Sequence, residues 1–139
     1  MTLPVARQRN MGVIAKHPLA NVAWANGSRP PKDSYGYPYW ERLQKLKYDF
    51  LRGDLAQSAA TALRFGLSVP GVHTAIVGTA KPGRFLENAA ALEAGELPGA
   101  LFESIRQHGA KLRVPIGWGG TSLRKLSYQP HWVRLYPVS

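Results

Sequence analysis

Cysteine is absent from this chain of 139 residues, which excludes disulfide bonds and thiolate metal sites. Acidic residues are scarce as well. The chain contains eight Asp and Glu and 18 Lys and Arg, so the formal net charge is +10 at pH 7. The carboxylates show no close pair of the kind that acid–base catalysis uses, and the four His lie far apart in the sequence. The residues therefore predict neither a metal site nor a local catalytic set.

Long apolar runs are also missing, so no segment is expected to cross a bilayer. The first residues lack the charged-then-apolar order of a signal peptide. The hydrophobic share of 45% is ordinary for a globular protein, and the length suits one domain. We expect a soluble, cytoplasmic protein that makes no membrane contact.

The most informative segment that is present begins at residue 74. Residues 74–77 form a short apolar run rich in β-branched side chains, which predicts a strand buried on both faces. Gly78 ends this strand. Pro82 suits the first position of a helix, where its missing N–H costs nothing. The pattern therefore predicts a strand, a turn, and a helix that begins near Lys81 or Pro82.

This layout is typical of a phosphate site. The free amides and the positive dipole end of a helix N-terminus attract anions. Thr79 adds a hydroxyl, and Lys81 and Arg84 add two positive charges. The alternative is a plain strand–helix unit whose cations are solvated.

Two parts of the chain resemble a known family. Residues 62–68, 70–72, 76–79 and 84–88 are similar to the closing segment of the aldo/keto reductases, and residues 12–21 resemble the seventh barrel strand of that family and the turn after it. The segments also follow one another in the family's order and at its separation.

The resemblance implies an α/β fold, namely the C-terminal portion of a (β/α)8 TIM barrel with the last two strands and their flanking helices. A complete barrel needs about 250 residues, so we expect an incomplete barrel. Residues 1–121 would form this aldo/keto reductase-like part. Residues 122–139 would be a basic, aromatic tail without a family pattern.

The implied function is that of an oxidoreductase fragment that contributes the NADP(H)-binding end of the barrel. The family's catalytic Asp, Tyr, Lys and His come from the early strands, which we expect this chain to lack. Hydride transfer between NADPH and a carbonyl substrate would then require the missing half. That half would come from a separately encoded N-terminal partner, or the incomplete barrel would be covered by self-association.

The resemblance also implies cofactor contacts after the second strand. Arg84 matches an Arg that grips the adenosine 2′-phosphate, and its planar fork suits that task. Thr79 matches a hydroxyl position for the same phosphate. Glu87 and Asn88 match a Glu-Asn pair that contacts the adenine, although Asn88 could equally cap local backbone groups.

Other implied contacts lie where this chain departs from the family. Pro18 and Leu19 match the turn beside the pyrophosphate, but His17 stands where many members have Ser. Gly78 stands where some members place a Lys for the 2′-phosphate, and Lys81 could replace it from a neighbouring position. NADP is thus favoured over NAD.

The scaffold can also be predicted. We expect a helix end at residues 3–10, a strand at 13–15, an irregular loop at 26–40, a helix at 41–51, a helix capped by Asp54, and a last helix from Pro98. In the loop, four aromatic side chains could cover a cofactor or anchor the loop to the barrel rim; these are Tyr35, Tyr37, Tyr39 and Trp40.

Two other kinds of function remain open. The chain could be a truncated relic or interaction module that keeps the packing of a barrel without enzymatic activity. It could also bind single-stranded nucleic acid, because residues 111–139 combine cations with aromatic side chains and contain no acidic residue. No RNA- or DNA-binding motif accompanies that segment, so nucleic acid is the less favoured partner.

Overall fold

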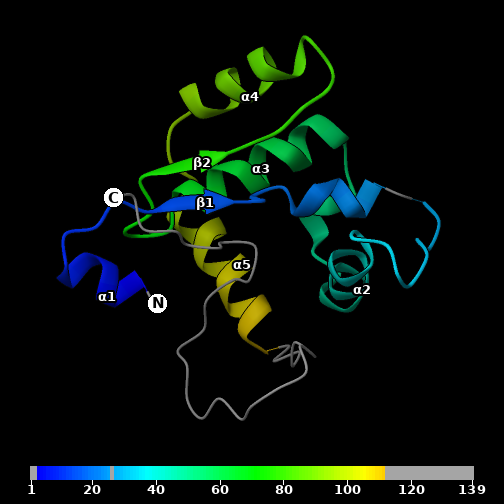
Figure 1. The fold of residues 1–139 in the computed structure, drawn as a ribbon, viewed down its shortest axis with the longest axis horizontal. Coiled ribbons are helices and arrows are strands. Elements are labelled where there is room, and N and C mark those ends of the chain that lie inside the picture. The colour runs from blue at the N-terminus through cyan, green and yellow to red at the C-terminus, as the bar shows by residue number, and fades with distance from the viewer. Residues whose placement is uncertain (1–2, 26, 112–139) are drawn as a thin grey trace.

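The fold was analysed in a computed structural model, which describes residues 3–25 and 27–111. The described part is mixed helix and strand, as expected for a partial α/β fold. The predicted tail of residues 122–139 lies outside the described residues, as does the predicted boundary at residue 121. Figure 1 shows the elements, which are α1 (Leu3–Gln8), β1 (Ile14–Lys16), η1 (Ala20–Ala25), α2 (Tyr37–Leu46), η2 (Asp49–Leu51), α3 (Leu55–Leu67), β2 (Thr74–Ile76), α4 (Arg84–Glu93) and α5 (Gly99–Lys111).

The two strands form a parallel pair, with Ile14 opposite Thr74 and Lys16 opposite Ile76. Parallel strands need a long crossover connection, and here the connection contains α2 and α3. Helix α3 lies behind the strands in Figure 1. Both strands run in the same direction, so the segments that leave their carboxyl ends emerge at one edge of the sheet.

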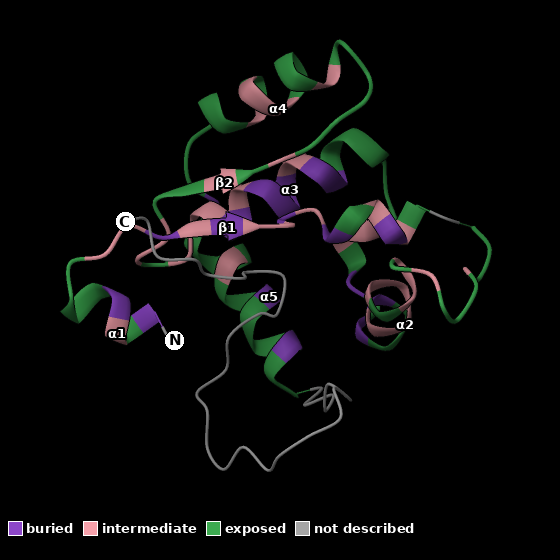
Figure 2. Cartoon of the chain, viewed as in Figure 1, coloured by how far each residue is buried: buried purple, intermediate pink, exposed green. Residues whose placement is uncertain are grey.

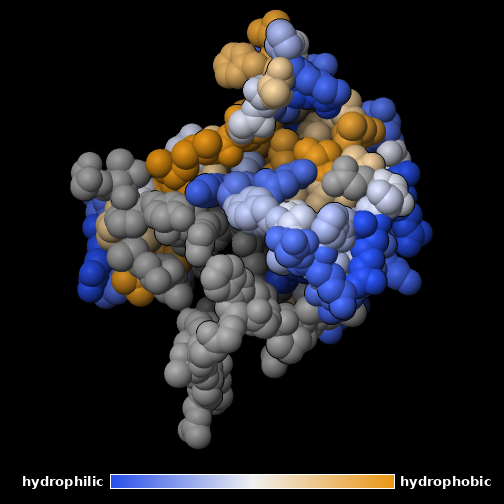
Figure 3. Space-filling view, turned by 45° about the vertical axis from the view of Figure 1, so that its right-hand side comes forward, coloured by the Kyte–Doolittle hydropathy of each residue, from blue (hydrophilic) through white to orange (hydrophobic). Residues whose placement is uncertain are grey.

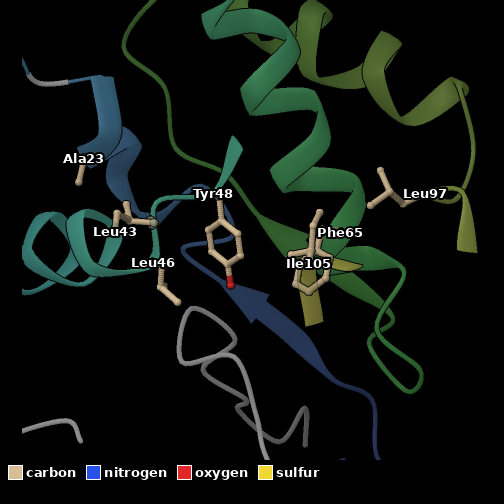
Figure 4. Close-up of a cluster of buried hydrophobic side chains, with 8 residues drawn as sticks. Ala23, Leu43, Leu46, Tyr48, Phe65, Leu97 and Ile105 are labelled. Atoms are coloured by element: carbon tan, nitrogen blue, oxygen red, sulfur yellow. The ribbon is translucent and has the colours of Figure 1, made fainter. Parts of the chain in front are cut away.

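The main core lies where α2, α3 and α5 meet. Phe65 of α3 is 1% exposed and Leu46 of α2 is 1% exposed, and both belong to a cluster that also includes Ile105 of α5. Figure 4 shows this cluster, and Figure 2 shows that buried positions concentrate on α3 and its neighbours. A smaller cluster packs α1 against Val13 at the entry to β1.

Helix α3 follows the sequence prediction closely. Asp54 caps its N-terminus by accepting a 2.9 Å hydrogen bond from the backbone N–H of Gln57, which satisfies one of the free amides there. Ala59, Ala62 and Leu63, which recur at helical spacing, are buried. The helix end and the first strand were also predicted near the positions of α1 and β1.

The predicted burial of the second strand is wrong. Ile76 is 59% exposed, and Thr74 is exposed as well. Side chains alternate between the two faces of a strand, and no element of the described residues covers the face to which these two belong. The strand also ends at Ile76, one residue before the predicted end.

The helix after β2 begins later than predicted. Its first residue is Arg84, with Gly83 at the N-cap, instead of Lys81 or Pro82. The Thr79 hydroxyl accepts the backbone N–H of Lys81 at 3.2 Å. This local bond holds the chain in a turn that competes with helix formation.

The predicted loop at residues 26–40 is too long, and the helix predicted at 41–51 is displaced. Helix α2 already begins at Tyr37. Pro38 lies in its first turn, where proline is tolerated. The helix ends at Leu46, because Lys47 takes a left-handed conformation with φ of 46°. Tyr39 and Trp40 therefore pack from a helix against the main core cluster.

None of the helices in residues 3–25 and 27–111 combines the length and apolarity that a bilayer crossing requires.

Candidate functional site

The structure brings two of the predicted segments together. His17, Pro18 and Leu19 follow β1 directly, and residues 77–79 follow β2. Because Lys16 pairs with Ile76 at the carboxyl ends of parallel strands, both segments leave the sheet at the same edge. In open α/β sheets, ligands bind at this edge.

His17 is fixed in the turn after β1. Its backbone is left-handed, with φ of 58°. Its Nδ1 atom lies 3.0 Å from Asn21 Oδ1, and its Nε2 atom lies 3.1 Å from the Tyr35 hydroxyl. The rings of Tyr35 and Tyr39 lie 5.9 and 6.0 Å from the His17 ring. The side chain is thus held by two hydrogen bonds and two ring contacts.

Pro18 and Leu19 form a turn that is anchored on α3. Pro18 is buried, and a Cβ added at Gly66 of α3 would lie 3.5 Å from the Pro18 Cβ atom. Within the turn, the Leu19 carbonyl accepts the N–H of Val22 at 2.7 Å. This bond holds the turn backbone in place. The N–H of Val22 is therefore already used within the turn and is not free for a ligand.

The segment after β2 is open by comparison. Gly78, Thr79 and Lys81 are all exposed. A Cβ added at Gly78 would meet no atom within 4 Å, so the missing Lys of the family pattern would have room here. The Lys81 ammonium is available to a ligand, whereas the Thr79 hydroxyl is engaged with the Lys81 backbone.

The remaining predicted residues line one groove between α3 and α4, with a volume of about 230 Å³. Arg84, Glu87 and Asn88 come from α4, and the opposite wall comes from the first half of α3. The lining residues are Asp54, Ala56, Gln57, Ala59, Ala60, Arg84, Glu87, Asn88 and Ala91.

Four alanines contribute apolar atoms to this lining, Ala56, Ala59 and Ala60 from α3 and Ala91 from α4, and apolar walls of this kind can contact a planar ring. The carboxylates and the amides can hydrogen-bond amino and hydroxyl groups. Arg84 already forms an ion pair, because its Nε atom lies 3.3 Å from Glu87 Oε2. A phosphate at Arg84 would have to compete with this carboxylate, and Asp54 adds a second negative charge to the groove.

The predicted residues therefore fall into two groups. One group surrounds the sheet edge, and the other lines the groove. Residues 77–83 connect them, since this segment runs from the end of β2 to the start of α4 (Figure 1). Sequence reasoning did not find Tyr35 as a partner of His17, nor Asp54 and Gln57 as groove residues.

No metal site is formed by the described residues, because no three His, Cys, Asp or Glu side chains gather there. The groups that the predicted site does present are two cations, Lys81 and Arg84, and the groove between α3 and α4.

Comparisons with protein-family models, with curated proteins and with solved structures found no match to this chain. The assignment of a function therefore depends on the chain's own residues and on their arrangement.

Proposed function

We propose that this chain is the C-terminal, NADP(H)-binding portion of an aldo/keto reductase-like oxidoreductase. In this proposal β1 and β2 are the last two strands of a (β/α)8 barrel. Hydride passes between NADPH and a carbonyl substrate only when the early strands supply the catalytic residues. A cytoplasmic location fits a chain that contains no cysteine.

One observation carries the proposal. The two strands pair in parallel, with a helical crossover, so that the His17 turn and the Thr79 segment lie at the same carboxyl edge. Active sites of barrels of this kind lie at that edge. The register pairs Ile14 with Thr74, 60 residues later in the chain, and this parallel pairing brings the turns after both strands to one end of the sheet.

The groove gives a second support. The resemblance singles out Arg84, Glu87 and Asn88, and all three line the groove from the α4 side. In this proposal the adenine lies between the alanines of the groove and the 2′-phosphate lies at Arg84, the first residue of α4, with Lys81 three residues earlier in the chain as a second cation. A guanidinium fork binds a phosphate through two parallel hydrogen bonds.

The proposal also requires a partner. Among the described residues the sheet has two strands, so each strand has one lateral edge without a neighbouring strand, and parallel sheets are normally covered on both faces. The exposed Ile76 side chain lies on the uncovered face. The early strands of the barrel, as a separate chain or as a second copy that substitutes for them, would cover these edges.

The test is a titration of the purified chain with NADPH and with NADH, followed by fluorescence. We expect saturable binding that favours NADPH. Arg84→Ala should weaken NADPH binding by about tenfold or more, since hydrogen bonds to charged groups contribute about 1.5–3 kcal/mol, and it should leave NADH binding nearly unchanged.

Arg106 provides a matched control. It lies on α5 and pairs with Glu103 three residues earlier at 3.7 Å, much as Arg84 pairs with Glu87 at 3.3 Å. Arg106→Ala should not change NADPH binding. Equal losses in the two variants would mean that Arg84 acts through overall charge, which contradicts a built 2′-phosphate site.

An interaction module is the second candidate, and one observation favours it. Ile76, Phe85 and Leu86 are exposed by 59, 72 and 71%. In Figure 3 apolar atoms form a band across the molecule beneath α4 at the top. If the folded chain bound neither dinucleotide, the cofactor proposal would be rejected and a role in protein association would be favoured. The nucleic-acid alternative depends on residues 112–139, which lie outside the described ranges.

A further inference from the structure

A chain of hydrogen-bonded side chains lies beside the proposed cofactor site, and the proposed function does not use it. Tyr35, His17 and Asn21 form this chain, with 3.1 Å from the Tyr35 hydroxyl to His17 Nε2 and 3.0 Å from His17 Nδ1 to Asn21 Oδ1. These distances are those of ordinary hydrogen bonds.

The direction of each bond follows from the chemistry of the atoms. An amide oxygen can only accept, so in the tautomer that makes this hydrogen bond His17 Nδ1 carries the proton and donates to Asn21 Oδ1. The neutral imidazole then has its lone pair on Nε2. The Tyr35 hydroxyl must therefore donate to Nε2. This is the arrangement of an acidic hydroxyl, a histidine base and a group that orients the histidine.

The three residues also differ in accessibility. Tyr35 is 68% exposed, whereas His17 is half-buried and lies between the Tyr35 and Tyr39 rings. The base is thus held in place while the phenol remains open to a small molecule. Both belong to the sheet edge at which the carboxyl ends of β1 and β2 meet.

We propose that Tyr35 is a base-activated phenol that accepts an acyl group from an activated ester. The Tyr35 oxygen attacks the carbonyl carbon of the ester, and its proton passes to His17 Nε2. The new carbon–oxygen bond replaces the bond to the leaving alcohol, which takes the proton from His17 as it departs. The products are an acylated Tyr35 and a free alcohol. Asn21 is a positioning residue that holds the tautomer of His17.

Tyr37 offers an internal comparison. Its hydroxyl accepts a 2.8 Å hydrogen bond from Arg29, and a guanidinium cannot take up a proton. Tyr37 therefore has a charged neighbour but no base. Because both tyrosines belong to one molecule, the ratio of their reaction rates is independent of protein concentration.

The experiment treats the full chain with p-nitrophenyl acetate and follows acetylation of each tyrosine by peptide mass spectrometry. No dinucleotide is added, so the result does not depend on the proposed cofactor site. General-base assistance contributes typically about 10²–10⁴-fold. We expect Tyr35 to react about tenfold or more faster than Tyr37, and His17→Asn to remove most of this difference. Asparagine tolerates the left-handed backbone at position 17.

Two further variants keep the proposal open to refutation if His17→Asn fails to fold. Asn21→Asp keeps a group that only accepts and should retain the fast reaction, whereas Asn21→Gly removes the acceptor, suits the left-handed backbone and should slow it. Equal rates at Tyr35 and Tyr37 in the unmodified chain would overturn the proposal. So would an undiminished release of p-nitrophenol by Tyr35→Phe, because the acetyl group would then go to a side chain other than Tyr35.

Discussion

The segments that follow β1 and β2 leave the sheet at the same end, but they are supported differently. The turn after β1 rests on the core, since Val13 and Ala15 are 2% and 0% exposed and Pro18 is buried against α3. The segment after β2 has no such support. Its strand residues Thr74 and Ile76 are exposed, and α4 contains no buried residue.

In the proposed site, this difference predicts one side that keeps its shape and one side that adapts to the ligand. Helix α4 is attached mainly through α3, the helix across the groove. Regions with few buried apolar contacts open more easily than the core. We therefore expect the His17 turn to keep its shape without a ligand, and the Arg84 end of the site to become more ordered when its groove is filled.

The largest expected difference is in the free energy of unfolding, between a variant in the core and a variant on α4. Phe65→Ala removes a ring that is 1% exposed, and Phe85→Ala removes one that is 72% exposed. The first change should lower the free energy of unfolding by about 3–5 kcal/mol, and the second by less than about 0.5 kcal/mol. Urea denaturation followed by circular dichroism measures both. A cost of several kcal/mol at Phe85 would show that α4 is buried against another molecule in solution.

A smaller effect should come from the attachment of the segment after α4. The guanidinium of Arg64 on α3 donates to the backbone carbonyls of Ala94, Gly95 and Glu96 at 3.2, 2.8 and 2.6 Å. Arg64→Ala should cost about 1–2 kcal/mol and should speed amide hydrogen exchange in α4 more than in α2.

Arg52 supplies the control for this change. It pairs with Asp49 at 3.3 Å, with side chains that are 67 and 92% exposed, and exposed pairs contribute little. Arg52→Ala should leave both the stability and the exchange of α4 unchanged. If amide exchange in α4 were as slow in the Arg64 variant as in the unmodified chain, the hydrogen bonds from Arg64 would not be what holds α4 in place.

Local patterns explain why part of the fold could be predicted. Asp54 before an apolar stripe marked the start of α3, because an N-cap needs only neighbouring residues. The strand near residue 75 was predicted from a short β-branched run, and the strand near residue 14 from the resemblance of residues 12–21 to a barrel strand. The exposure of Ile76 could not be read from the same run, since burial of a strand depends on which distant elements cover it.

In the candidate site, too, contacts between sequence neighbours could be predicted, whereas contacts between distant residues could not. Arg84, Glu87 and Asn88 are close in sequence and on one helix, so a short pattern could place them together. The bond between Tyr35 and His17 spans 18 residues of irregular chain, and no period in the sequence reports such a contact. Asp54 was assigned only its capping role, because the groove that it lines exists only when α3 and α4 pack.

The smallest predicted effect is on the affinity for NADPH, and it concerns the Arg84 side of the proposed site. Glu87 holds the Arg84 guanidinium at 3.3 Å, with side chains that are 57 and 29% exposed. Exposed ion pairs of this kind contribute about 0.2–1 kcal/mol. A phosphate that replaces the carboxylate must overcome this energy, so Glu87→Gln should tighten NADPH binding by up to about fivefold. Glu103→Gln releases Arg106 in the same way and should change nothing. Weaker NADPH binding by Glu87→Gln would mean that the carboxylate contacts the adenine, as the resemblance implies, and that losing this contact outweighs the release of Arg84.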